Sequence, residues 1–98
     1  MIIVTGSILA NADSLDKLLA ISLEHTRRSR TEPGCVSHAV HQDAENLLRL
    51  VFLEEWADKA ALAAHFAVPA SRDFVKAAME LSDEPPVMTI YEATPVQM

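Results

Sequence analysis

The chain has 98 residues, of which half are apolar and 22% are charged, and its formal net charge is -6. A chain of this length folds as one domain that buries roughly 60 to 70% of its unfolded surface, so we treat residues 1–98 as a single domain and not as a disordered or fibrous chain. The negative charge argues against a nucleic-acid partner, because phosphate backbones bind basic surfaces.

The first two predicted elements are a strand and a long helix. Residues 2–9 are rich in apolar and β-branched side chains, which is typical of a strand, and the sequence NADS closes it. Apolar residues then recur at helical spacing from Leu15, so we expect a helix capped by Asn11 or Asp13. This helix should end near Glu32, because the sequence EPG supplies a helix-stopping proline and a permissive glycine.

The inward face of this helix changes character along its length. It begins with leucines and continues with Ser22, Thr26 and Ser29. Either a pocket lined by hydroxyl groups or hydrogen bonds from these hydroxyls to the helix carbonyls would explain the pattern. His25 is expected at the exposed flank, and the basic run RRSR, residues 27–30, is interpreted as the solvated helix end, where cations complement the helix dipole.

The next two predicted elements form an antiparallel hairpin. The sequences CVSHAVHQ, residues 35–42, and LLRLVFLEEW, residues 47–56, are typical of strands, and DAEN between them is typical of a turn. The second of these strands is apolar on both faces. Leu48, Leu50, Phe52 and Trp56 point one way, while Leu47, Val51 and Leu53 point the other way.

Two helices and a last strand complete the chain. Asp58 should cap a short helix that Pro69 ends, Ser71 should cap the next helix, and residues 87–94 predict a fourth strand. The resulting order, β-α-β-β-α-α-β, is that of an α+β, ferredoxin-like fold with the helices on one face of an antiparallel sheet. The other apolar sheet face would then be uncovered, so we expect a homodimer packed sheet to sheet.

Strand parity and helical spacing predict which side chains meet between the sheet and the helices. Glu54 shares a strand face with Phe52 and Trp56, and His65 shares a helix face with Phe66. These residues would line a mostly apolar cavity for a small molecule. His65 has a reference pKa of about 6.5 that suits a general base, although packing alone would also explain His65 and Trp56. Glu54 is either a strand-end residue that reaches solvent or a pocket group.

The remaining histidines do not predict a metal site. His38 and His41 lie three residues apart on a strand, so they face opposite sides and cannot chelate one ion together. His38 faces either the pocket or the dimer interface. The sequence has no glycine-rich phosphate loop, serine-hydrolase motif or cysteine cluster, so we expect neither a metal nor another cofactor.

The single cysteine, Cys35, cannot form an internal disulfide bond, so the fold does not need an oxidising compartment. The first ten residues, MIIVTGSILA, lack the basic leader of a signal peptide, and no apolar run approaches the ~20 residues of a membrane helix. We therefore expect a cytoplasmic protein without a membrane partner.

Two stretches of the sequence resemble a known family. EPGC after the first helix, and LEEWADKAALAAH across the third strand and the following helix, are similar to the antibiotic biosynthesis monooxygenase (ABM) superfamily of dimeric α+β barrels. The resemblance extends from Ile2 to about Glu92. Similar domains include cofactor-independent monooxygenases that oxidise anthrones or quinols, haem-degrading enzymes, an isomerase of a phosphorylated signalling molecule, and domains without an assigned activity.

The resemblance implies a cofactor-independent oxygenase that acts on a small electron-rich aromatic substrate. His65 would be the base, and Trp56, Phe52 and Phe66 would hold the ring, with Glu54, His38, Ser22 and Thr26 also lining the site. An isomerase or lyase that transfers protons in the same pocket, and a dimer that only binds a small ligand, are the alternatives. Haem-degrading relatives carry an asparagine where this chain has Ser7, and anthrone-oxidising relatives carry one where it has Phe52, so neither mechanism transfers directly.

Overall fold

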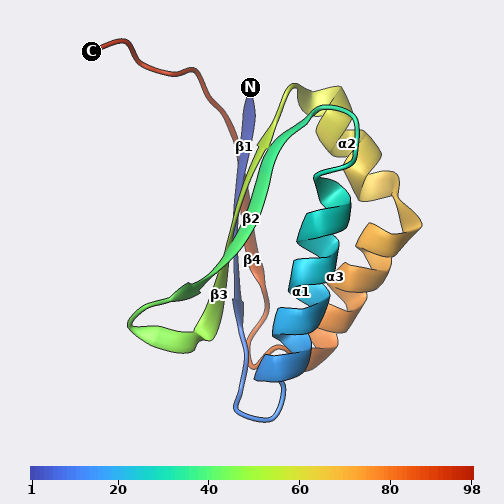
Figure 1. Ribbon diagram of the computed structural model, residues 1–98, viewed down its shortest axis with the longest axis vertical. Coiled ribbons are helices and arrows are strands. Elements are labelled where there is room, and N and C mark those ends of the chain that lie inside the picture. Colours follow the sequence, from blue (N-terminus) through green and yellow to red (C-terminus); the bar gives the residue numbers. More distant parts are fainter.

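The computed structural model describes residues 1–98 as a four-stranded antiparallel sheet with three helices on one face (Figure 1). The strands are β1 (Ile2–Leu9), β2 (Cys35–Asp43), β3 (Asn46–Trp56) and β4 (Val87–Glu92), and the helices are α1 (Leu15–Ser29), α2 (Lys59–Ala67) and α3 (Pro69–Leu81). The strand order is β2-β3-β1-β4. The predicted ferredoxin-like α+β fold is therefore confirmed.

The sheet order places β3 between the two strands that α1 connects. Trp56 at the end of β3 is paired with Ile2 of β1 on one side and with Cys35 of β2 on the other. A shift of one residue in this register would turn every β3 side chain to the opposite face. The end of β3 is thus held by hydrogen bonds on both sides, at the level where α2 crosses the sheet.

The two faces of β3 divide as its alternation predicts. Leu50, Phe52 and Trp56 are buried under the helices, whereas Leu47 and Leu53 are 59% and 46% exposed on the outer face. The buried side chains belong to two apolar clusters. One contains Ile8, Ala10, Leu18, Leu50, Phe52 and Ala78, and the other contains Ile2, Val4, Trp56 and Leu62. Glu54 lies between Phe52 and Trp56 on the same strand face, so a polar site separates the two clusters.

Three predicted helix ends are wrong. Neither Asn11 nor Asp13 caps α1, whose N-cap position is Ser14; Asn11 Oδ1 instead accepts hydrogen bonds from the amides of Asp13 and Ser14, which forms a turn before the helix begins. Helix α1 ends at Ser29, before the predicted end at Glu32. Helix α3 begins at Pro69, with Val68 as its N-cap, three residues earlier than predicted, because proline fits the first turn of a helix, and Ser71 is a buried residue inside it.

The predicted cap of α2 is confirmed, since Asp58 Oδ1 accepts a hydrogen bond from the Ala61 amide at 2.8 Å. The loop that follows α1 packs against this end of α2. Gly34 in that loop has a φ of +82°, and a Cβ at this position would overlap the side chain of Ala61. Glycine therefore allows the loop that carries Glu32 to lie directly against α2. No helix has the length and apolar character required to cross a membrane.

Candidate functional site

A cavity of about 540 Å³ lies between the sheet and helices α2 and α3. Its walls are largely apolar, and the larger apolar side chains that line it are Phe52, Phe66, Phe74, Met79 and Met88. The polar side chains in the wall are Ser7, His25, Glu54, His65, Ser71 and Arg72. A mostly apolar cavity of this size with a few polar groups is typical of a small-molecule site.

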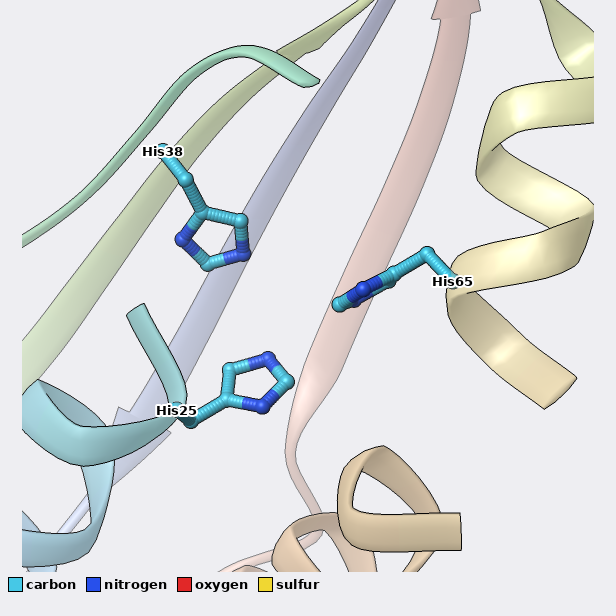
Figure 2. Close-up of side chains that lie close together, drawn as sticks. All are labelled: His25, His38 and His65. Carbon is cyan, nitrogen blue, oxygen red and sulfur yellow. The ribbon is translucent and has the colours of Figure 1, made fainter. Parts of the chain in front are cut away.

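Three buried histidines converge beside this cavity (Figure 2). His25 comes from α1, His38 from β2 and His65 from α2. The ring centroid of His25 is 5.3 Å from those of both other rings, and the His38 and His65 centroids are 5.8 Å apart. The prediction that His25 is exposed is wrong, because its ring is only 5% exposed and stacks on Phe74 with the centroids 4.1 Å apart.

A carboxylate orients the ring of His65. Its Nδ1 lies 2.8 Å from Oε1 of Glu32, and both side chains are mostly buried. An ionised carboxylate only accepts hydrogen bonds, so Nδ1 donates and the neutral ring keeps its lone pair on Nε2. Because His65 is in the wall of the cavity, this pair has the arrangement of an oriented general base.

An arginine gives His25 the opposite arrangement. Arg28 Nη2 donates to Nδ1 of His25 at 2.9 Å and to Oγ of Ser71 at 3.0 Å. A guanidinium group only donates, so His25 is neutral and has its proton on Nε2. Burial, the neighbouring His38 and His65 rings and the Arg28 charge lower the pKa of His25 from 6.5 to about 3. The run RRSR is therefore not simply a solvated helix end, since Arg28 is half-buried in the site.

Glu54 connects the third histidine to the tryptophan. Trp56 Nε1 donates a hydrogen bond to Glu54 Oε1 at 2.9 Å, and His38 Nε2 lies 3.3 Å from the same oxygen. Burial alone would raise the pKa of Glu54, but the adjacent His38 and the Trp56 N–H outweigh burial and hold this pKa below its usual value. Neither nitrogen of His38, which is 2% exposed, makes a well-directed hydrogen bond. Glu54 is therefore a paired buried carboxylate, not a residue that reaches solvent.

The structure places the predicted site residues in two groups. His65, Phe52, Phe66 and Glu54 line the cavity. Trp56, His38, Ser22 and Thr26 are buried behind its wall. Trp56 and His65 do contact each other, with their ring centroids 4.6 Å apart, so the tryptophan supports the histidine from behind. His38 points to the helix side of the sheet, while His41 is exposed on the other face.

The hydroxyl groups on α1 do not share one explanation. Ser29 Oγ donates to the carbonyl of His25 at 2.6 Å, so for Ser29 the hydrogen bond to a helix carbonyl, and not a hydroxyl-lined pocket, is the explanation. Ser22 Oγ and Thr26 Oγ1 are buried and have no hydrogen-bond partner in the chain. Neither residue is in the cavity wall.

Sequence reasoning missed three residues of the site. Helical spacing from Leu18 through Ser22 to His25 and Ser29 repeats at four, three and four residues, which was a sufficient signal that His25 is on the buried stripe. No comparable signal exists for Glu32, which belongs to the loop after α1, or for Arg28, whose partner Ser71 is 43 residues away.

A sequence profile of the family described as antibiotic biosynthesis monooxygenase matches residues 1–77 of the chain. The chain belongs to this family. The match contains the three histidines, Glu32 and Glu54, so all the polar pairs described above lie within the family's domain. The resemblance predicted from EPGC and LEEWADKAALAAH is confirmed.

A curated relative matches nearly the whole chain. An uncharacterized protein of Synechocystis, sll1783, is 32% identical over 96 residues, which cover 98% of this chain and 65% of that protein. The chain thus spans slightly less than two thirds of the length of this curated relative.

Two solved structures have the same fold. A candidate antibiotic biosynthesis monooxygenase from Deinococcus radiodurans superposes with a TM-score of 0.94 at 24% identity, over 100% of this chain and 97% of that one. Rv0793 from Mycobacterium tuberculosis superposes with a TM-score of 0.90 at 22% identity, over 99% of this chain and 98% of that one. At these identities the likeness establishes the fold and does not determine the reaction.

The lowered pKa of His25 predicts that acid destabilises the folded protein. The unfolded chain binds this proton near pH 6.5, whereas the folded chain binds it only near pH 3, so the free energy of unfolding decreases as the pH falls through this window. From pH 6.5 to pH 5, His25 alone should decrease the free energy of unfolding by about 2 kcal/mol. His25→Phe keeps an aromatic ring on Phe74 but has no group that titrates. Over the same pH range, the free energy of unfolding of this variant should therefore decrease by about 2 kcal/mol less than that of the unsubstituted protein. Urea denaturation at both pH values measures the difference, and equal losses in the two proteins would contradict the prediction.

Proposed function

We propose that the protein is a cofactor-independent oxygenase that oxidises a small electron-rich aromatic compound, such as a quinol or an anthrone, with molecular oxygen. The observation that carries the proposal is the Glu32–His65 pair in the wall of an apolar cavity. Family membership supports an oxygenase as the class of reaction, and the oriented base supports deprotonation of the substrate as its first step.

In the proposed reaction, Nε2 of His65 takes the acidic proton of the bound substrate. Glu32 stabilises the resulting imidazolium through its hydrogen bond to Nδ1. The substrate anion is a strong enough electron donor to react with O₂ directly, so the substrate supplies all the electrons. In an anthrone, one oxygen atom enters the product as a carbonyl group that replaces the two C–H bonds of the ring methylene, and the other oxygen atom leaves as water. In a quinol, one oxygen atom enters as a hydroxyl group in place of one C–H bond while the two O–H groups are oxidised to the quinone, and the other oxygen atom again leaves as water.

The rest of the cavity would bind and shield the aromatic ring. Phe52, Phe66 and Phe74 present aromatic surface in its wall. Exclusion of water by these side chains would strengthen the electrostatic effect of the base. Arg72 brings a cation to the same wall, where it could pair with an oxyanion that forms on the substrate.

The base predicts a large effect of His65→Ala on oxygen uptake. In the presence of EDTA, which removes trace metals that accelerate autoxidation, the original protein should consume oxygen with at least one member of a panel of quinols and anthrones. His65→Ala should decrease this rate by about 10²–10⁴-fold, the usual contribution of a general base. The control is His41→Ala, since His41 is exposed on the opposite sheet face. Uptake no faster than autoxidation across the panel would contradict the proposal, and turnover that persists without oxygen would indicate an isomerase or lyase instead.

Glu32 is a positioning residue in this scheme, and Glu32→Gln tests it separately. The amide keeps the shape of the side chain but removes the charge that stabilises the imidazolium. We expect kcat to fall by about tenfold or more with little change in KM. The increase of the rate with pH, which follows loss of the proton from the base, should shift to lower pH. Steady-state kinetics as a function of pH provides the measurement. A change in KM alone would contradict the role assigned to Glu32.

We also propose that two copies of the chain associate through the outer faces of their sheets. The exposed apolar side chains that the strand register places on the outer face are Leu47, Leu53, Val87 and Tyr91. Large apolar side chains exposed together on one sheet face are unusual on a monomer, and two sheets that pack face to face would cover them. All three helices lie on the opposite side of the sheet in Figure 1, so they leave this face open.

Leu53→Lys tests the dimer because Leu53 is paired with Thr5 and Ala39 in the middle of the sheet. A lysine there would place a charge in the proposed interface, so light scattering should give the mass of a dimer for the original protein and of a monomer for the variant. Leu23→Lys is the matched control, because Leu23 is also exposed but belongs to α1 on the other face. A monomeric original protein, or a dimer that Leu53→Lys leaves intact, would contradict the proposal.

A further inference from the structure

The three-histidine cluster has a property that the oxygenase proposal does not use. One nitrogen from each of His25, His38 and His65 lies within 4.8 Å of the corresponding nitrogens of the other two rings. Two imidazoles bound to one tetrahedral Zn²⁺ have their nitrogens about 3.4 Å apart, since each Zn–N bond is about 2.0–2.1 Å long. Small side-chain rotations are therefore sufficient to bring the three nitrogens to a common ion.

His38 supplies an independent reason to expect a ligand. Its ring is 2% exposed, faces the other two histidines in Figure 2, and makes no well-directed hydrogen bond through either nitrogen. A buried polar group without a partner is costly, and in folded proteins a bound ion or water molecule commonly satisfies such a group. The contact with Glu54 involves only Nε2 of His38 and is poorly directed, so it leaves the hydrogen-bonding capacity of the ring unsatisfied.

The surroundings of the cluster also suit a divalent cation. Glu54 lies beside Nε2 of His38, and Glu32 accepts the Nδ1 hydrogen of His65, so the carboxylate of Glu32 is behind the His65 ring. Carboxylates in this position orient metal-binding histidines and increase their basicity. Together the two carboxylates carry two negative charges, against one positive charge on Arg28. The cluster thus has a net charge of about -1, which a divalent ion would more than offset.

We propose that His38, His65 and His25 form a binding site for a divalent transition-metal ion of the type that prefers imidazole, such as Zn²⁺, Co²⁺ or Ni²⁺. His25 and His65 line the cavity, so the ion would be accessible from it. Three protein ligands also leave one coordination position free, as in zinc sites that bind a small molecule. Metal binding occupies Nε2 of His65 and is therefore incompatible with its use as a base at the same time.

Arg28 opposes metal binding in a way that can be measured. It donates to Nδ1 of His25 and thereby keeps the proton on Nε2, the nitrogen that faces the other rings in Figure 2. For this nitrogen to bind a metal, the proton must move to Nδ1 and Arg28 must leave it. Arg28 is thus a competitor for the third ligand, and its removal should strengthen binding.

The experiment is a titration of EDTA-treated, dialysed protein with ZnCl₂ by calorimetry, and with CoCl₂ by visible absorption, which distinguishes tetrahedral from octahedral Co²⁺. We expect one ion for each chain with micromolar or tighter affinity and a tetrahedral Co²⁺ spectrum. Glu32→Gln should weaken Zn²⁺ binding by about 10–100-fold, and His38→Gln and His65→Ala should weaken it by more. Arg28→Gln should strengthen it by about tenfold.

Two controls keep the assignment falsifiable. His41→Ala removes the one histidine outside the cluster and should leave the affinity unchanged. Thermal denaturation with and without Zn²⁺ identifies folded variants, because an ion that binds the native state raises the Tm of every variant that retains the site. The proposal would be overturned by the absence of stoichiometric binding, by an octahedral Co²⁺ spectrum, or by affinity that folded His38→Gln retains. None of these measurements needs turnover, so they are independent of the oxygenase proposal.

Discussion

The buried carboxylate of Glu54 constrains the site more than any other group. A charge on an otherwise apolar strand face is stable only with partners, and both of its partners come from the sheet. Trp56 follows Glu54 by two residues on the same strand face, and His38 on β2 is the register partner of Glu54. The need to pair Glu54 thus fixes the indole, the ring of His38 and the register of the hairpin together. These three side chains form the rear wall against which His65 packs.

Two histidines in one cluster have different chemistry because their neighbours differ. His65 has a carboxylate at Nδ1 and so presents a lone pair on Nε2, whereas His25 has a guanidinium group at Nδ1 and so presents a proton on Nε2. Their ring centroids are only 5.3 Å apart. One ring can therefore accept a proton from a ligand while the adjacent ring donates a hydrogen bond. Residues outside the cavity, Glu32 and Arg28, create this difference.

Sequence periodicity predicted which face of a strand a side chain occupies. It did not predict which side chains from different elements come together in the site. The alternation of β3 correctly assigned Phe52, Glu54 and Trp56 to the covered face, because the side-chain period of a strand is fixed. The same rule did not reveal that Trp56 lies behind the cavity wall and not in it. Glu32 belongs to a loop whose path depends on Gly34 and on contact with α2. Since no periodicity describes such a loop, its carboxylate could be found only in three dimensions.

Proton abstraction and metal binding, the two proposed uses of the site, both require the lone pair on Nε2 of His65. A proton and a divalent cation are both Lewis acids for this nitrogen, and the carboxylate of Glu32 strengthens its bond to either one. Whether a proton or a metal ion binds this nitrogen must therefore depend on the residues that only one of the two uses requires. Deprotonation of a bound substrate needs only His65 and Glu32, whereas a metal site also needs His38 and His25. Arg28 at His25 therefore biases the cluster toward proton transfer without touching His65.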